Sequence, residues 1–297
     1  MKIEETKKIA VVGAGVMGSG IAMACARSGF ETVLVDINED ILKAAYSEIR
    51  DGHFGFLRLV EKGKMTSQEM DDIIAKIKST TDPNKAAKDA DVVIEAVSED
   101  LEVKRRIWQQ YDKLCPERTI FASNTSTIMI TEQASATDRP DRFIGMHWFN
   151  PAQVMKLIEV IRGVSSSDET FNFMIDFCRK IGKNPVEAND APGFFSSHFI
   201  CNFMYTAIRM FEQGIAGIEE IDTICKQGFG FPMGPFELMD LTGLDIPFHG
   251  MAYTYSITGD PVDKAPVTLK KLVTAGYVGH KRESKGGWYD YYHIPCK

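Results

Sequence analysis

One histidine and one glutamate near the middle of the chain have the residue types and the spacing of an acid–base pair. His147 lies in the apolar segment GMHWF, and Glu159 lies twelve residues later in KLIEVI. A buried carboxyl group is costly unless it has a partner, and the imidazole is a suitable one. A carboxylate beside a histidine fixes the ring tautomer and stabilises the protonated ring, which suits proton transfer to and from a ligand.

The residues between them indicate how the two side chains could meet. Asn150-Pro151 ends one extended segment, and Lys156 to Ile161 forms another. A turn centred near Gln153 would place Glu159 beside His147 on an antiparallel neighbour. The alternative is a core histidine bonded to a carbonyl group, with a glutamate that happens to lie at a strand edge. The apolar neighbours of Glu159 favour the pair.

A polar run follows the apolar segment TIFA. It supplies hydroxyl and amide groups from Ser123, Asn124, Thr125, Ser126 and Thr127. The end of a sheet strand is where ligands bind in α/β folds, so these groups are candidates to contact one. The alternative is structural, because Ser126 or Thr127 could cap a following helix.

The first forty residues predict a dinucleotide site. The β-branched run Ile9–Val12 is followed by Gly13, Gly15 and Gly18, an Ala-rich helix, and a second strand that ends at Asp36. The first glycine suits a tight turn, the second a close approach to a pyrophosphate, and the third close packing of helix on strand. An acid about 20 residues on binds the ribose hydroxyls and would repel the 2′-phosphate of NADP, so NAD is expected. The alternative is a glycine-rich turn of another α/β fold.

Composition bounds the remaining possibilities. The 297 residues suffice for two domains, with 44% hydrophobic and 25% charged residues. A net charge of −7 opposes non-specific binding to nucleic acid. The six cysteines include no C-x-x-C motif, so neither a zinc or other metal site nor a thioredoxin-type pair is expected. A disulfide framework is not expected in a chain this long and of ordinary composition. No signal segment and no run of about 20 apolar residues is visible, so a cytoplasmic protein is expected.

The elements that must position these residues alternate between strand and helix, which predicts a mostly parallel sheet. Further strands are expected over 90–97, 119–126 and 142–149. Residues 40–80 predict a helical hairpin with a turn at 63–66, where Thr66 and Glu69 resemble a capping box. Arg58, Lys62 and Lys64 cluster near its tip, either to hold a phosphate or as a solvated charged face.

The fold class is therefore α/β: a Rossmann-type, mostly parallel sheet with a projecting helical hairpin, followed by a smaller all-helical domain. The segment NPVEANDAPGFF contains proline and glycine and precedes a long helical region. We place the domains at residues 1–195 and 196–297.

Several longer motifs, in order and at similar spacing, resemble one family. The segments GAGVMGSGIA, SNTST, GMHWFNPAQVMKLIEVIRG, DAPGF and FPMGPFELMDLTGLD are similar to the short-chain 3-hydroxyacyl-CoA dehydrogenases, especially their bacterial 3-hydroxybutyryl-CoA members. The resemblance covers nearly the whole chain. It implies an NAD-dependent, reversible oxidation of an L-3-hydroxyacyl-CoA, and a homodimer formed through the helical domain.

The resemblance also implies roles for single residues. His147 would be the general base, Glu159 its partner, and Ser126 the hydroxyl group that binds the 3-oxygen of the substrate. The implied NAD-binding residues are Gly13, Ala14, Gly15, Val16, Met17, Gly18, Asp36, Glu99, Lys104, Asn124, Asn150 and Lys281. The implied substrate-binding residues, apart from Ser126, are Ser197 and the CoA-phosphate residues Arg58, Lys62 and Lys64.

Two departures leave the substrate open. After DAPGF the family has Asn-Arg where this chain has Ser197 and His198, and the tail GHKRESKGGWY is about two residues longer. A serine has one hydroxyl donor where an asparagine amide has two, so the substrate contact changes. A free 3-hydroxy acid without CoA is the alternative substrate, and a non-catalytic NAD-binding protein is a third reading.

Overall fold

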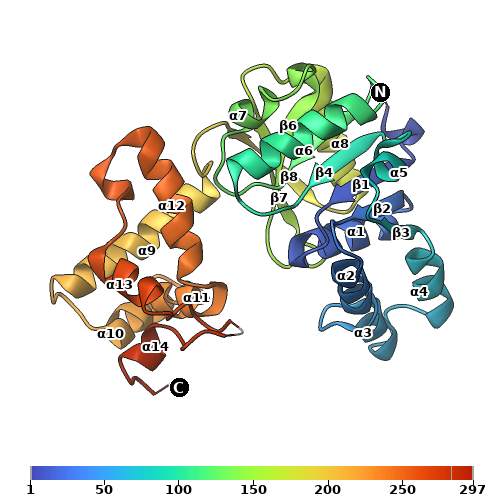
Figure 1. Ribbon diagram of the computed structural model, residues 1–297. Helices are drawn as coiled ribbons and strands as arrows, with labels where there is room; N and C mark the ends of the chain where they lie inside the picture. Colours follow the sequence, from blue (N-terminus) through green and yellow to red (C-terminus); the bar gives the residue numbers. More distant parts are fainter. Residues whose placement is uncertain (1, 282, 296–297) are drawn as a thin grey trace. The chain divides into compact units, whose positions relative to one another are not determined.

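The computed structural model describes residues 2–281 and 283–295. The chain forms two compact units, Met1–Asp190 and Ala191–Lys297 (Figure 1). The first long helix of the second unit begins at Ser196.

The first unit is built on an eight-stranded sheet with the order β3-β2-β1-β4-β5-β6-β7-β8. All neighbouring strands are parallel except β6 and β7, which are antiparallel. The strands are β1 (Lys8–Val12), β2 (Glu31–Val35), β3 (Ile77–Thr80), β4 (Val92–Glu95), β5 (Ile120–Ser123), β6 (Phe143–Trp148), β7 (Leu157–Arg162) and β8 (Asn184–Asn189). This mostly parallel Rossmann-type sheet confirms the predicted fold class.

Helices connect the strands and cover the sheet, as Figure 1 shows. They are α1 (Val16–Arg27), α2 (Glu39–Asp51), α3 (Phe56–Glu61), α4 (Ser67–Ile74), α5 (Pro83–Ala87), α6 (Leu101–Leu114), α7 (Ile130–Ala134) and α8 (Asp168–Lys180). The β4 and β5 strands are completely buried, because helices cover both of their faces. The core of this unit is therefore made of β-branched strand residues and the small side chains of α1.

The projecting helices α2, α3 and α4 follow β2 (Figure 1). The predicted turn at 63–66 joins α3 to α4. The capping box is present: Glu69 N–H donates to Thr66 Oγ1 at 3.1 Å, and Thr66 N–H donates to Glu69 Oε2 at 2.7 Å. A second interruption, Gly52–Gly55, separates α2 from α3. The region is thus three helices, with a short loop that carries His53 and Phe54.

The second unit is helical, as predicted. It contains α9 (Ser196–Glu212), α10 (Ile218–Thr223), α11 (Pro235–Thr242), α12 (Asp245–Thr258), α13 (Val267–Thr274) and α14 (Trp288–Tyr291). Its core gathers apolar side chains around Tyr205, Phe236 and Trp288. Within the described residues, no helix is both long and apolar enough to span a membrane.

Candidate active site

His147 and Glu159 meet across the antiparallel strands β6 and β7. The register pairs them directly, and the turn between them is centred on Gln153, as predicted. Glu159 Oε2 lies 2.7 Å from His147 Nδ1. Both side chains are almost completely buried, with exposed fractions of 6% for His147 and 4% for Glu159. The predicted contact of His147 with Glu159 is therefore present in the structure.

This geometry assigns the two ring nitrogens of His147. When Nδ1 donates to the Glu159 carboxylate, the lone pair of the neutral ring lies on Nε2. The pair lies near the carboxyl end of β6, which is parallel to β5 and, through β4, to β1. His147 is therefore at the same sheet edge as the glycine loop and the polar run after β5.

The polar run folds around the carboxylate of Glu99. Oε1 of Glu99 accepts hydrogen bonds from Thr125 Oγ1 at 2.5 Å, from the Ser126 and Thr127 amides at 2.8 Å, and from Thr127 Oγ1 at 2.9 Å. Neither Ser126 nor Thr127 is a helix cap, because the next helix, α7, begins at Ile130 and is capped by the Asp190 carboxylate. The backbone of Ser126 is thus fixed by Glu99.

Glu99 is in turn held by a buried lysine. Lys104 has an exposed side-chain fraction of 1%, and its Nζ lies 2.6 Å from Glu95 Oε1 and 3.3 Å from Glu99 Oε2. Burial alone would lower the pKa of Lys104, but the two carboxylates raise it. Burial alone would raise the pKa of Glu99, but Lys104 and the hydroxyl and amide donors of the polar run lower it. Lys104 and Glu99 are therefore both held in their charged forms.

The glycine loop has the geometry that a pyrophosphate requires. Gly13 has φ +100°, and a Cβ there would lie 2.5 Å from the Ala96 carbonyl oxygen. A Cβ on Gly18 would lie 1.7 Å from the Gly13 carbonyl oxygen, whereas a Cβ on Gly15 would meet nothing within 4 Å. Gly13 and Gly18 thus serve the turn and the packing of α1, and the space above Gly15 remains for a ligand.

Three further predicted residues lie at this edge. Asp36 follows β2, and its Oδ2 accepts a hydrogen bond from Ala14 N–H at 2.7 Å. Asn124 Oδ1 accepts one from Trp148 N–H at 2.9 Å, which ties the polar run to the strand of His147. Asn150 is exposed in the connection after β6. Val16 and Met17 form the first turn of α1.

A basic pocket of about 270 Å³ lies between α1, the Gly52–Gly55 loop, α3 and the β6–β7 connection. Arg58 and Lys62 of the basic cluster line this pocket, and Lys64 is not among its lining residues. Sequence reasoning missed Arg27 and His53, which also line it. No short-range signal indicates them. Arg27 belongs to α1, which is distant in sequence from α3, and His53 lies in a loop that exists only because the helical segment is interrupted between α2 and α3. Arg58 also pairs with Glu61 at 2.8 Å.

The remaining predicted residues belong to the second unit. Ser197 is half-buried in the first turn of α9. Beside it, His198 Nε2 lies 2.8 Å from Oδ1 of the buried Asp263. Lys281 Nζ donates to Asp245 Oδ1 at 2.5 Å.

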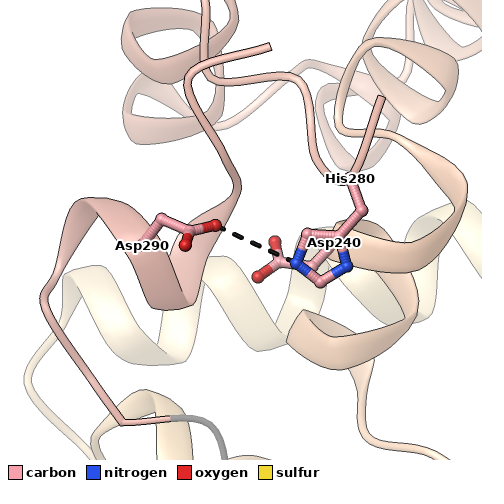
Figure 2. Close-up of side chains that lie close together, drawn as sticks. All are labelled: Asp240, His280 and Asp290. Atoms are coloured by element: carbon pink, nitrogen blue, oxygen red, sulfur yellow. Dashed lines mark ion pairs between the residues drawn. The ribbon is translucent and has the colours of Figure 1, made fainter. Parts of the chain in front are cut away.

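Asp240, His280 and Asp290 also gather in this unit, with one ligand-type atom of each within 4.8 Å of the others (Figure 2). The Asp240 carboxylate accepts the N–H groups of Trp288 and Tyr289, and Asp290 accepts that of Gly287. These bonds hold the start of α14 and account for the positions of the two carboxylates, and His280 Nε2 lies 3.9 Å from Asp290 Oδ2.

Both units match models of one family. Residues 8–191 match the NAD binding domain of 3-hydroxyacyl-CoA dehydrogenase, and residues 193–291 match its C-terminal domain. The chain is 42% identical over 287 residues to a probable 3-hydroxybutyryl-CoA dehydrogenase of Bacillus subtilis, covering 97% of this chain and 98% of that one. It is 40% identical over 292 residues to the human mitochondrial hydroxyacyl-coenzyme A dehydrogenase, covering 96% and 91%.

A solved structure extends the likeness to three dimensions. The crystal structure of (S)-3-hydroxybutyryl-CoA dehydrogenase from Ralstonia eutropha has a TM-score of 0.88 and 37% identity, covering 93% of this chain and 96% of that one. Since both family models match in order and relatives of this identity align along almost the full length, the chain belongs to the 3-hydroxyacyl-CoA dehydrogenase family.

Proposed function

We propose that this protein is an NAD-dependent dehydrogenase that interconverts an L-3-hydroxyacyl-CoA and the 3-ketoacyl-CoA, with the short-chain 3-hydroxybutyryl-CoA as substrate. The observation that supports this most is the 2.7 Å contact of His147 with Glu159, at the sheet edge that also holds the glycine loop. The family models and the names of the relatives agree with this activity.

The groups of this chain have distinct tasks in the proposed reaction. NAD, when bound, supplies the acceptor for the hydride that leaves C3. His147 Nε2 removes the proton of the 3-hydroxyl group, so that its oxygen becomes the carbonyl oxygen. Glu159 stabilises the resulting imidazolium through Nδ1. Ser126, fixed by Glu99, hydrogen-bonds the 3-oxygen. In the reverse direction, His147 returns the same proton.

The NAD-binding residues follow from the fit of the glycine loop. The open space above Gly15 and the amides at the start of α1 suit a pyrophosphate, and the Asp36 carboxylate suits a ribose. Glu99, together with Asn124 and Asn150, faces the nicotinamide half. The burial of Lys104 argues that it acts through Glu99 rather than by touching the cofactor. Lys281, paired with Asp245, is the proposed contact from the second unit.

The basic pocket would take the phosphate groups of CoA. Arg27, Arg58 and Lys62 bring positive charge to its wall, and His53 adds an N–H donor. In a chain with a net charge of −7, such a cluster is a local attraction for an anionic ligand. A volume of about 270 Å³ is near the lower limit of ligand sites, so it suits one end of a CoA thioester rather than all of it. Lys64 is a nearby exposed cation, and Ser197 would contact the substrate from the second unit.

We also propose a cytoplasmic homodimer formed through the helical unit. That unit exposes large apolar side chains on several of its elements, including Phe199, Phe229 and Ile246, which a second copy would cover. Five buried free cysteines suit a reducing compartment. Sedimentation equilibrium at micromolar concentration should give twice the monomer mass, and a monomer would refute the dimer.

A substrate panel tests the proposed activity. Acetoacetyl-CoA and free acetoacetate are each offered with NADH and with NADPH, and nucleotide oxidation is followed at 340 nm. We expect rapid turnover only with acetoacetyl-CoA and NADH. Turnover of the free acid at comparable kcat/KM would instead assign a substrate without CoA, and no turnover of any 3-keto compound would leave a non-catalytic protein.

Charge variants test the phosphate pocket separately. Arg58→Ala combined with Lys62→Ala should raise KM for acetoacetyl-CoA and leave KM for NADH unchanged. The matched control replaces Lys43 and Lys113 by Ala, since both are exposed and lie outside the pocket. An equal effect of the two double variants would show that only net charge matters.

A further inference from the structure

The connection between β6 and β7 joins the two halves of the proposed site. His147 and Glu159 lie on the strands at its two ends. Gln153 and Val154, at its middle, line the basic pocket together with Arg58 and Lys62. It also packs on α1, since a Cβ on Gly20 would lie 2.4 Å from Gln153 Oε1. A shift of this connection would therefore disturb both the imidazole and the phosphate pocket.

One buried ammonium group holds the connection in place. Lys183, between α8 and β8, has an exposed fraction of 6%. Its Nζ donates to the carbonyl oxygens of Ala152 and Met155, each at 2.6 Å. The same Nζ lies 5.3 Å from the centre of the Trp148 ring, next to His147. In the part of the chain that the structure describes, Lys183 forms no ion pair with a carboxylate, so its hydrogen bonds to the connection and its contact with the Trp148 ring are its main interactions.

We propose that Lys183 is a positioning residue of the active site, whose ammonium group fixes the β6–β7 connection so that His147 and the phosphate pocket are correctly spaced for one substrate. The inference rests on the proposed function, because that spacing matters only if a CoA thioester reaches from the pocket to the imidazole. Charged donors form stronger hydrogen bonds than neutral ones, and a cation is attracted to the face of an indole. Both interactions need the protonated lysine.

The surroundings of Lys183 place its titration within an accessible pH range. Burial and the nearby Lys156 lower the pKa of Lys183 to about 8, while Cys25 of α1 and Cys178 of α8 oppose that shift. Deprotonation above that pH would remove the charge that holds Ala152 and Met155. We therefore expect a loss of activity on the alkaline side that originates at Lys183.

The test compares Lys183→Met and Lys183→Arg with the wild type, and uses Lys180→Met as the control, because Lys180 is an exposed lysine at the end of α8. Acetoacetyl-CoA reduction is measured from pH 6.5 to 9.5. At pH 7, Lys183→Met should lower kcat/KM about 10- to 100-fold, the scale of a misplaced catalytic group, with an unchanged Kd for NADH. Lys183→Arg should retain most of the activity, since a guanidinium remains charged.

The pH profiles separate positioning from general stability. The ratio of wild-type kcat/KM to that of Lys183→Met should fall above pH 8. The ratio of the kcat/KM of Lys183→Arg to that of Lys183→Met should stay constant up to pH 9.5. Stability should change in the opposite direction: between pH 8 and about 10.4 the unfolded chain binds more protons at this lysine, so wild-type stability rises relative to Lys183→Met. If Lys183 only stabilised the fold, the relative activity and the relative stability of the wild type would change in the same direction with pH.

The possible results distinguish failure of the Lys183 role from failure of the proposed function. Activity of Lys183→Met within twofold of wild type, or an activity ratio independent of pH, would overturn the positioning role while leaving the dehydrogenase intact. No turnover of acetoacetyl-CoA by the wild type would overturn the proposed function and this inference together. If Lys183→Met does not fold, the comparison of wild type with Lys183→Arg decides: identical alkaline limbs refute the inference, and a limb displaced to higher pH in the Arg variant supports it.

Discussion

The carboxylate of Asp36 is bonded to the glycine loop itself, because its Oδ2 accepts the N–H of Ala14 at 2.7 Å. Its other oxygen, Oδ1, accepts the N–H of Ile37 at 2.7 Å. These two amides orient the carboxylate at the end of β2, beside the loop where a dinucleotide phosphate would lie. A carboxylate that follows β2 is therefore held beside the glycine loop that follows β1.

Asp36 should determine the choice between NADH and NADPH. Placing a carboxylate next to a 2′-phosphate costs several kcal/mol, so we expect wild-type kcat/KM to favour NADH by about 100-fold or more. Asp36→Ser removes the negative charge and should reduce that preference at least tenfold, mainly through KM for NADPH. Steady-state kinetics with both nucleotides measure the ratio. An unchanged preference would place the ribose elsewhere.

The glycines of the loop provide a matched pair of substitutions. Gly18→Ala places a methyl group 1.7 Å from the Gly13 carbonyl oxygen, so α1 must move and the free energy of unfolding should fall by about 1–3 kcal/mol. Gly15→Ala meets nothing within 4 Å and should leave the unfolding midpoint unchanged, yet weaken NADH binding at least tenfold. Thermal unfolding and fluorescence titration with NADH distinguish these effects. Similar effects of both variants would contradict the separate roles.

The sequence could predict these features because their signals are local. The glycine spacing, the alternation of strand and helix, and the turn centred on Gln153 each depend on a few adjacent residues. A hairpin register, once its turn is located, places His147 opposite Glu159 without further information.

The network around Lys104 could not be predicted in the same way. In EDLEVKRR this lysine has charged neighbours and is typical of an exposed helix face. Its burial follows from the contact of α6 with Glu95 at the end of β4, which only the packed sheet produces. The basic pocket is a similar case, since Arg27 and His53 join Arg58 only through tertiary packing.

His147→Gln should lower kcat about 10²–10⁴-fold, the usual contribution of general acid–base catalysis, because glutamine cannot accept the hydroxyl proton. Glu159→Gln should lower kcat as well, since a neutral amide no longer stabilises the imidazolium at Nδ1. NADH should bind both variants with unchanged Kd, as measured by fluorescence titration. Normal turnover of His147→Gln would exclude this imidazole from the reaction.

Lys104→Met should be strongly destabilising. It leaves the carboxylates of Glu95 and Glu99 without their buried cation, and breaking such a pair costs about 3–5 kcal/mol. Lys113→Met is the control, because it lies on the same helix but is exposed. Urea unfolding at pH 7 measures both.

The pH dependence of the Lys104 effect follows from Glu99. Its folded-state pKa is lowered, so its stabilising contribution is complete above the unfolded pKa of about 4.3 and is lost as the pH falls through the folded value. The difference between wild type and Lys104→Met should therefore narrow in acid. A difference that stays constant from pH 7 to pH 3 would contradict the ionised network.

The buried carboxylate of Asp263 should stabilise the helical unit through its hydrogen bonds. It accepts hydrogen bonds from Asn202 Nδ2 at 3.0 Å and Thr258 Oγ1 at 2.7 Å, and lies 2.8 Å from His198 Nε2. Asp263→Asn replaces one acceptor oxygen by an NH₂ group, which cannot accept a hydrogen bond. One of the buried donors around it is left without an acceptor, at a cost of about 1–3 kcal/mol. His198→Ala should cost less, because Asn202 and Thr258 still bond to Asp263. The exposed His249→Ala serves as the control.

The sign of the pH dependence tests that account of Asp263. Burial alone would raise its pKa, but the donors from Thr258, Asn202 and His198 lower it. The stabilisation is therefore complete above the unfolded pKa of about 3.9 and disappears as the pH falls through the lower folded value. The stability difference between wild type and Asp263→Asn should be level from pH 5 to 6 and shrink below pH 4. A difference that grew in acid would mean that Asp263 is protonated in the folded protein, and that His198 is held by something other than a carboxylate.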